Sequence, residues 1–484
     1  MQQNMETLKD KTAKGLFWGG MNNGVQQLLG LAFGSILARL LDASDYCMTA
    51  MLAIFSVIAN ELQSSGFKTG LINLKAPTHK DFNAVFWFNI IAGAVIYLML
   101  FFCAPLIADY CHQPKLIPLS RYVFLGFVFS SFGIAQSAYM TKQMQIKQIA
   151  KCGMIATLTS SIISVILAAL DFGYWALATQ YLAYIAINTL LLWYFSEWRP
   201  TMKVTFEPIR RLFPFSFKIM VSAIFTQVNN YIMNLLLGHY YGETNTGHYN
   251  QAYLWSSKCH LFVGNMMRQV DQTVLVGLHD ERERQLMVLR KMVRFTAFIT
   301  FPMLFGLGLI SHEFIILAIG EKWTFSASLL PYLCLCGAFM PLSLLLTDAI
   351  ISQHRSDIYL WSTMVLGILQ IVLLVGLWRE GIYAMVLAYT LLNILWVFVW
   401  HFFVRRLMGY RLLSFLKDIL PFALAAAGVM VLTGFVTQTI ENIWMQLASR
   451  VVIAAILYYG VMRISGAVIL KECLAFVKGK IVKG

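Results

Sequence analysis

Long, unbroken apolar stretches constrain this chain more than any other feature of its sequence. Two of them, Phe82–Ala108 and Ile419–Val436, contain no charged residue. Only helices and closed barrels satisfy all backbone hydrogen bonds in lipid, and the strands of a barrel alternate over about ten residues. A membrane-spanning helix instead needs about 20 consecutive apolar residues. The stretches therefore predict an all-α integral membrane protein.

The supply of charged residues supports the same interpretation. Charged residues make up 12% of the 484 residues and hydrophobic residues make up 59%, with a mean hydropathy of +0.67. Soluble proteins contain about 25% charged residues, so this chain could not cover a water-facing surface of its size. Apolar segments bounded by charges or turn residues predict about fourteen transmembrane helices. The loops between them are too short to hold a soluble catalytic domain.

Lysine and arginine fall mostly on one side of the predicted membrane. With the N-terminus inside, the cytoplasmic side receives Lys9–Lys14, Arg290, Arg294 and the basic C-terminal tail, among others. The outer side receives few, of which Arg450 is one. Cytoplasmic loops carry such an excess, so the pattern predicts a multi-pass protein with both termini in the cytoplasm. It also accounts for the net charge of +14 without a nucleic-acid partner, because the basic residues do not alternate with aromatic residues on a soluble surface.

The two halves of the chain echo each other. The segment Ile36–Leu41, which ends the first span, is repeated loosely as Leu236–Tyr241, and Gly173–Ala176 is repeated as Gly381–Ala384. Internal repeats are common in secondary transporters, where the substrate path lies between the repeated halves. Each half contains six predicted spans, which is an even number, so we expect two parallel, pseudo-symmetric lobes.

The predicted organisation has five parts. They are an N-terminal six-helix lobe, a cytoplasmic connection, a C-terminal six-helix lobe, two additional helices and a basic amphipathic tail: residues 1–197, 198–213, 214–406, 407–466 and 467–484. The tail alternates apolar and lysine residues. Two interpretations of it stay open, namely a helix resting on anionic membrane lipids and a frayed basic end.

Lys258 is the clearest polar group at membrane depth. It lies near the middle of the predicted eighth span, too deep to reach the interface easily. An ammonium there needs a water-filled cavity, a carboxylate partner or an anionic ligand. Glu61, in the middle of the second span, is the natural carboxylate partner. A substrate-binding role in a cavity and a structural ion pair with Glu61 both stay open.

Amide side chains form stripes on the spans that open the two halves. The first span carries Asn22, Asn23, Gln26 and Gln27, and the seventh carries Gln227, Asn229, Asn230 and Asn234. Residues four apart share a helix face, so the amides form polar stripes. Hydrogen bonds between helices would account for one stripe. Two stripes at related places favour a hydrated central cleft that binds substrate.

Five further polar or charged residues are candidates for the same cavity. Lys68, Lys218 and Arg268 lie at cytoplasmic ends of spans, where they either attract a diphosphate headgroup or serve as ordinary positive-inside anchors. Asp348 and Gln136 lie within spans, and Asp348 is a weak candidate for a coupling-ion site.

Searches for catalytic and cofactor motifs are negative. The sequence has no phosphate-binding G-x-x-x-x-G-K-[ST] loop, no G-x-S-x-G and no H-E-x-x-H. The eight cysteines are scattered without metal-ligand spacing. We expect neither an enzyme nor a cofactor nor a metal site.

The chain resembles the polysaccharide transporter family of the MOP flippase superfamily, in particular its Wzx-type members. The resemblance covers nearly the whole chain, and the motifs that carry it are Lys14–Trp18, Ile36–Leu41 with Asp45-Tyr46, Ser65–Phe67 with Leu71-Ile72, Phe86-Trp87 and Trp198–Pro200. It departs from the usual pattern at Cys47, where glycine is usual, and at His239, where arginine is common.

The resemblance implies a fold like that of the MOP and MATE transporters, with two six-helix lobes forming a V around a central cavity and two extra helices. It implies a flippase of the bacterial inner membrane that moves undecaprenyl-diphosphate-linked oligosaccharide to the outer leaflet by alternating access, for surface polysaccharide biosynthesis. Polysaccharide polymerase and glycosyltransferases are then the expected partners. A multidrug or toxin exporter of the same superfamily is the alternative, although such an exporter would favour acidic cavity residues over Lys258.

Overall fold

A computed structural model describes residues 24–73, 77–143, 145–202, 207–277, 281–353, 355–466 and 469–470. These ranges contain helices and turns and no strand. The chain divides into two compact units, Met1–Gly247 and His248–Gly484. Of the predicted basic tail, only Ile469 and Leu470 are described, and both are buried.

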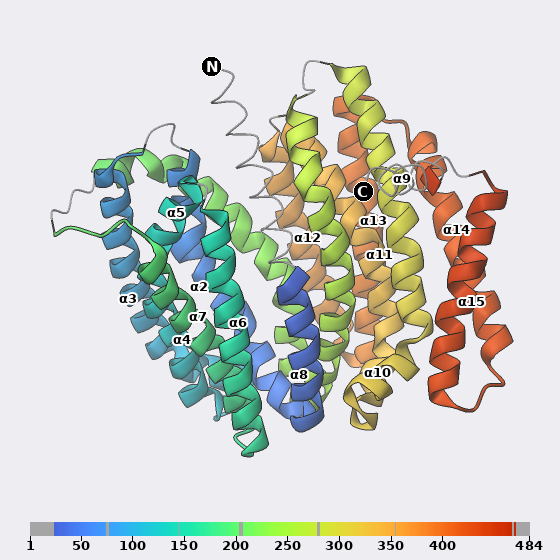
Figure 1. The fold of residues 1–484 in the computed structure, drawn as a ribbon, viewed down its shortest axis with the longest axis horizontal. Coiled ribbons are helices and arrows are strands. Elements are labelled where there is room, and N and C mark those ends of the chain that lie inside the picture. Colours follow the sequence, from blue (N-terminus) through green and yellow to red (C-terminus); the bar gives the residue numbers. More distant parts are fainter. Residues whose placement is uncertain are drawn as a thin grey trace. The chain divides into compact units, whose positions relative to one another are not determined.

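The first unit begins with the helix Gly24–Leu40. It continues with α2 (Ala43–Asn73), α3 (His79–Tyr110), α4 (Leu116–Ser131), α5 (Ile134–Lys142), α6 (Ile146–Ala169), α7 (Tyr174–Phe195) and the first arm of α8 (Glu207–Gly277), as Figure 1 shows. α3 packs on α4, α6 packs on α7, and α4 also contacts α7. α4 and α5 are bent by 42° at Phe132 and Gly133, so together they form one broken span. The core of this unit includes Met48, Met51, Phe124 and Phe127, all buried.

A break at Gly242 divides α8 into two arms. Gly242 has a φ of +75°, a conformation that glycine adopts without steric penalty. The predicted seventh and eighth spans are therefore the two arms of one helical segment. The first arm packs with the first unit, because His239 Nδ1 donates to the Tyr110 carbonyl at 2.6 Å and the two rings stack. The predicted division into six-helix lobes stays a prediction, since the boundary between the compact units falls after this arm.

The second unit holds the remaining helices. They are the second arm of α8, α9 (Arg282–Leu309), α10 (Ser311–Ile319), η1 (Glu321–Trp323), α11 (Thr324–Ser352), α12 (Ser356–Gly376), η2 (Trp378–Glu380), α13 (Ile382–Met408), α14 (Leu412–Thr437) and α15 (Ile443–Ile464). α11 packs on both α9 and α13, and it has the largest buried share of any candidate span that the structure describes. α14 packs on α9, and α15 lies beside α14 (Figure 1).

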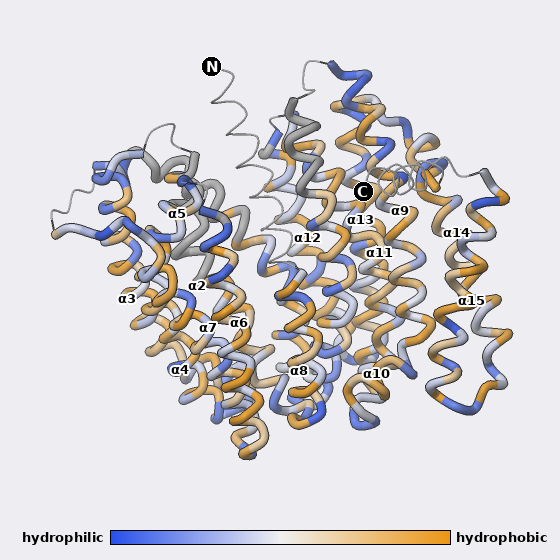
Figure 2. The backbone as a smooth tube through the Cα atoms, in the orientation of Figure 1, coloured by the Kyte–Doolittle hydropathy of each residue, from blue (hydrophilic) through white to orange (hydrophobic). Residues whose placement is uncertain are grey.

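Helix lengths and exposed side chains confirm an all-α membrane protein. Nine described helices are long and apolar enough to span a membrane, and the bent pair α4–α5 is a tenth. With Gly24–Leu40, α2 and the arms of α8, the described helices are consistent with fourteen spans. Figure 2 shows hydrophobic residues along the helices and hydrophilic residues gathered toward many helix ends. Phe102 and Phe435 are 74% and 71% exposed, as expected for side chains that face lipid.

The sequence repeat has a backbone counterpart in each unit. Gly173 precedes α7 with a φ of +53°, and Gly381 precedes α13 with a φ of +97°. Both values lie in the region that favours glycine. The repeated segments Ile36–Leu41 and Leu236–Tyr241 also share a buried environment within the first unit. Their buried residues include Leu37, Ala38, Leu236 and Leu237. The repeated motifs therefore mark turns and packed helix ends.

Candidate functional site

Several predicted site residues lie outside the described part of the chain. Asn22 and Asn23 precede it, and the side chains of Glu61, Lys68, Lys218 and Arg268 are not described. The Lys258–Glu61 pairing and the predicted diphosphate anchors at the cytoplasmic ends therefore stay predictions.

The amide residues of the first unit differ in their environment. Gln26, Gln27 and Gln227 are half-buried, whereas Asn230 is exposed. Asn234, four residues after Asn230, is buried, and its Oδ1 atom has no hydrogen-bond partner among the described residues. Asn230 therefore presents its amide outward, while Asn234 is packed inside the first unit. The proposed polar cleft stays a prediction.

Lys258 lies on the second arm of α8 and has an aromatic neighbour. Its side chain is half-buried, and Nζ lies 4.6 Å from the centroid of the Trp255 ring. A cation over an aromatic face gains electrostatic stabilisation, about 2 kcal/mol when water is excluded. Trp255 is itself fixed by an edge-to-face contact with Phe314, at 4.9 Å between centroids. Sequence reasoning, which considered water, a carboxylate or an anionic ligand beside Lys258, missed Trp255, although residues three apart on a helix are neighbours.

Close packing holds this arm against α11. Ser256 Oγ donates to the Leu333 carbonyl at 2.8 Å, and a Cβ atom on Gly337 would stand 2.9 Å from Ser256 Oγ. Asp348, the weak candidate for ion coupling, lies near the C-terminal end of α11 and is buried. Gln136 is fully buried on α5 in the first unit, and neither its Oε1 nor its Nε2 atom has a partner in the described ranges.

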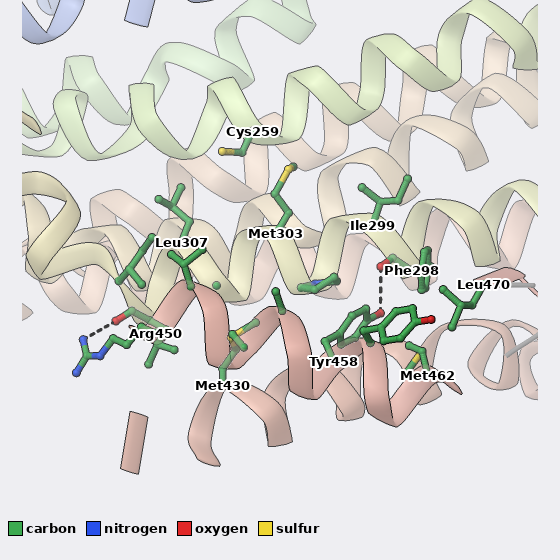
Figure 3. Close-up of a pocket in the computed structure, with 18 residues that line it drawn as sticks. Cys259, Phe298, Ile299, Met303, Leu307, Met430, Arg450, Tyr458, Met462 and Leu470 are labelled. Atoms are coloured by element: carbon green, nitrogen blue, oxygen red, sulfur yellow. Dashed lines mark hydrogen bonds between the residues drawn. The ribbon is translucent and has the colours of Figure 1, made fainter. Parts of the chain in front are cut away.

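An apolar pocket of about 600 Å³ lies among α8, α9, α14 and α15 of the second unit. Figure 3 shows Met303, Leu307 and Met430 along it, with Arg450 at one end and Met462 at the other. Tyr458 lines the same pocket, and its hydroxyl donates to the Phe298 carbonyl at 3.0 Å (Figure 3). The lining is almost wholly apolar, so the pocket suits a hydrocarbon chain.

A buried ion pair closes one end of this pocket. Arg450 Nη1 lies 2.6 Å from Glu313 Oε1, and the side chains are 14% and 3% exposed. Arg450 also donates to Thr437 Oγ1 and to the Leu309 carbonyl, both at 3.1 Å. These bonds join α15 to α9, α10 and α14. Sequence reasoning placed Arg450 only among the outer-side charges and did not single out Glu313, because their pairing depends on tertiary packing.

A second charged cluster joins α9 to α14. Arg290 bonds Asp418 through two nitrogens, at 2.8 and 3.1 Å, and Arg294 lies 3.6 Å from the same carboxylate. The Tyr410 hydroxyl donates to Asp418 at 2.8 Å. Burial first, and then the Asp418 carboxylate, raise the pKa of Tyr410 above its usual range. Two arginines that counted toward the cytoplasmic charge excess thus also hold helices together.

The described residues include no group of three or more His, Cys, Asp or Glu side chains that could hold a metal ion. The seven described cysteines are free, and five of them are buried. Burial of this kind is typical of cysteines that pack as small apolar residues.

Comparison with known proteins relates this arrangement to polysaccharide biosynthesis. The chain is 25% identical to lipopolysaccharide biosynthesis protein WzxC of Escherichia coli (strain K12) over 358 residues, which cover 73% of this chain and 72% of that protein. It is 23% identical to teichuronic acid biosynthesis protein TuaB of Bacillus subtilis (strain 168), with 93% of this chain and 94% of that protein covered.

A solved structure shares the fold. The lipid II flippase MurJ, in its inward closed conformation, superposes with a TM-score of 0.74 at 14% sequence identity. The match covers 93% of this chain and 98% of that chain. It confirms the predicted fold class.

The family match is also direct. The sequence profile of the family described as polysaccharide biosynthesis protein matches residues 36–328, which is more than half of the chain. The chain belongs to the polysaccharide biosynthesis protein family.

Proposed function

We propose that this protein is a flippase, which moves undecaprenyl-diphosphate-linked oligosaccharide from the cytoplasmic to the outer leaflet for surface polysaccharide biosynthesis. One observation carries the proposal: a member of a polysaccharide biosynthesis family has, within its described part, nine helices that are long and apolar enough to span a membrane. Such a protein suits the transfer of a finished lipid-linked sugar across the membrane.

The chemistry of the described residues fits each part of such a substrate. Lys258 supplies a half-buried ammonium for the diphosphate, and the Trp255 ring beside Nζ stabilises its charge. Half-buried amides such as Gln26 and Gln227 suit sugar hydroxyls. The apolar pocket between α9 and α15 suits the hydrocarbon chain (Figure 3). Transport by alternating access of the two halves then follows the behaviour of transporters with internal repeats.

The proposal includes a location and partners. The excess of cytoplasmic lysine and arginine supports a bacterial inner-membrane protein with both termini in the cytoplasm. A flippase of this kind works between the glycosyltransferases that assemble the substrate and the polymerase that consumes it. Reporter fusions at each terminus test the orientation. Activity, at either terminus, of a reporter that works only outside the cytoplasm would contradict it.

Deleting the gene in its host and locating the lipid-linked oligosaccharides tests the function. We expect complete undecaprenyl-diphosphate oligosaccharide to accumulate on the cytoplasmic face, with loss of surface glycan. Normal glycan and normal intermediates, in a strain without a second flippase, would contradict the proposal and favour the small-molecule exporter.

Complementation with variants tests the role of Lys258. Lys258→Ala should fail to restore surface glycan, and Lys258→Arg should restore part of it because the charge is kept. Lys417→Ala, at an exposed basic position on α14, is the matched control and should behave like the unaltered protein. Full activity of Lys258→Ala would remove Lys258 from the site.

A further inference from the structure

A cavity of about 340 Å³ lies inside the first unit, among α2, α4, α7 and the first arm of α8. α2 contributes Thr49, Ser56 and the apolar residues between them at spacings of three and four, so one helix face forms a wall. Tyr181 on α7 and Tyr231 on α8 line the same cavity. None of these residues belongs to the amide and lysine positions considered above.

Hydroxyl groups without partners in the described part of the chain border this cavity. Ser56, Tyr181 and Tyr231 make no side-chain hydrogen bond to any residue in the ranges that the structure describes, and Ser56 is 7% exposed. The Thr49 hydroxyl donates to the Tyr46 carbonyl at 3.0 Å, which leaves its oxygen able to accept a bond. Ser56 is buried and the two tyrosines are half-buried, and polar groups in such places are normally satisfied by protein, water or ligand. Here a ligand in the cavity would satisfy hydroxyls from three helices at once.

The cavity wall selects against charged ligands. The ten residues that line it in the described part of the chain include no Lys, Arg, His, Asp or Glu. A diphosphate would find no cation here, and a cationic drug would find no carboxylate. An ionised group brought in without a partner would carry a large desolvation penalty. The ligand that fits is uncharged and carries several hydroxyl groups.

The size and remaining surface indicate one sugar ring. Leu52, Val123 and Leu177 supply apolar surface beside the two tyrosine rings. A pyranose has an apolar C–H face that packs on such rings and a rim of hydroxyls. The volume is near the lower end of the range for ligand pockets, about 300–1,000 Å³.

We propose that this cavity is a subsite for one uncharged sugar residue of the transported oligosaccharide, with Tyr181 and Tyr231 as its recognition residues. The inference rests on the proposed flippase function and adds to it the part of the substrate that the first unit reads. It separates recognition of the glycan from recognition of the diphosphate, which needs a cation.

Binding by the full-length protein in lipid nanodiscs tests this subsite. The probes are lipid-linked oligosaccharide extracted from the host lacking this gene, and undecaprenyl diphosphate without sugar. Tyr181→Phe and Tyr231→Phe each remove one hydroxyl and keep the ring. Each should weaken binding of the oligosaccharide-bearing lipid roughly three- to tenfold, the effect of one neutral hydrogen bond, and leave undecaprenyl diphosphate unaffected. Tyr184→Phe, on α7 outside the cavity, is the matched control.

A second variant tests the cavity by filling it. Ala53 lines the wall on α2 and is half-buried, so Ala53→Phe places a ring in the space for the sugar. We expect this variant to lose the preference for the oligosaccharide-bearing lipid while it still binds undecaprenyl diphosphate.

The outcomes separate the subsite from the function. If the unaltered protein binds neither lipid, the proposed function fails. If it binds both lipids equally, recognition rests on the diphosphate alone and the subsite is wrong. If it prefers the oligosaccharide-bearing lipid but that preference survives in both tyrosine variants and in Ala53→Phe, the function stands and the subsite is wrong. Equal weakening of both lipids in a variant would show a structural effect and would also overturn the subsite.

Discussion

The carboxylate of Asp45 lies directly against the backbone of Gly173. A Cβ atom placed on Gly173 would stand 2.7 Å from Asp45 Oδ1, closer than real Cβ contacts. The second carboxylate oxygen, Oδ2, accepts a hydrogen bond from the Asp42 backbone nitrogen at 3.0 Å. The aspartate of one sequence motif thus packs on the glycine of another, and this contact joins the start of α2 to the start of α7.

Gly173→Ala should destabilise the protein through both this contact and its backbone conformation. The φ of +53° strains any residue with a Cβ atom, and the Asp45 oxygen would have to move. We expect a loss of about 1–3 kcal/mol, measured as a lower thermal midpoint of the purified protein in detergent.

Gly381→Ala is the matched control for this change. Gly381 also has a positive φ, +97°, but no described atom lies within 4 Å of the position that a Cβ atom would take on it. Gly381→Ala should therefore lower the thermal midpoint only by the cost of the strained backbone conformation. Equal losses for the two variants would mean that the Asp45 contact contributes nothing.

Gly247→Ala should be more disruptive, although alanine is the better helix former. A Cβ atom on Gly247 would stand 1.8 Å from the Ala43 carbonyl oxygen, and a backbone atom cannot swing aside as a flexible side chain can. We expect poor expression or a thermal midpoint lower than that of Gly173→Ala. Gly460→Ala, on α15 where no described atom lies within 4 Å of the new Cβ, should instead be neutral or stabilising by up to about 1 kcal/mol. Normal stability of Gly247→Ala would contradict the close approach.

Breaking the Arg450–Glu313 pair should cost more than replacing both residues. Each side chain is largely buried, so Arg450→Met alone leaves the Glu313 carboxylate without its charge partner, at a cost of about 3–5 kcal/mol. The double variant Arg450→Met with Glu313→Leu removes both charges and should recover much of that loss. A double-mutant cycle of thermal stabilities measures the coupling. Strictly additive losses would show that the pair is not coupled.

Gln136→Leu should stabilise the first unit. Both polar atoms of this fully buried amide are without hydrogen-bond partners in the described ranges, and an apolar side chain of similar size removes that penalty, worth about 1–3 kcal/mol. Gln180→Leu is the opposing control, because Gln180 Nε2 donates to Ser161 Oγ at 3.1 Å and its loss should destabilise. A drop in the thermal midpoint of Gln136→Leu would show that its amide has a partner, and a stable variant without transport would give it a functional role.

The fold class could be predicted from the sequence because the signal is local. A span such as Phe82–Ala108 needs only consecutive apolar residues, and the structure has a single helix, α3, over it. The repeated glycines were also visible as a pattern, and their positive φ values now give the physical reason for it. Relations of this kind depend on neighbours along the chain.

Contacts between residues far apart in the chain could not be predicted from the sequence. Arg290 was counted only toward the cytoplasmic charge excess, and its pairing with Asp418 requires knowing that α9 packs on α14. Lys258 lies within the helix α8, but its Trp255 contact depends on the rotamers of both side chains, which the sequence does not give. The hydroxyls of Ser56 and Tyr231 are ordinary in sequence, and only the packing of α2 against other helices brings them to one cavity.

Residues that pack against each other and residues that line the cavity differ in how freely they can change during evolution. Asp45 with Gly173, and Ala43 with Gly247, are constrained by each other's atoms, so a change at one position calls for a change at its neighbour. The hydroxyls of Ser56, Tyr181 and Tyr231 hold no other described side chain in place, so they can be exchanged one at a time without loss of the scaffold. If the cavity reads one sugar as proposed, a lineage can follow a change in its surface glycan by single substitutions here while the helices around the cavity stay the same.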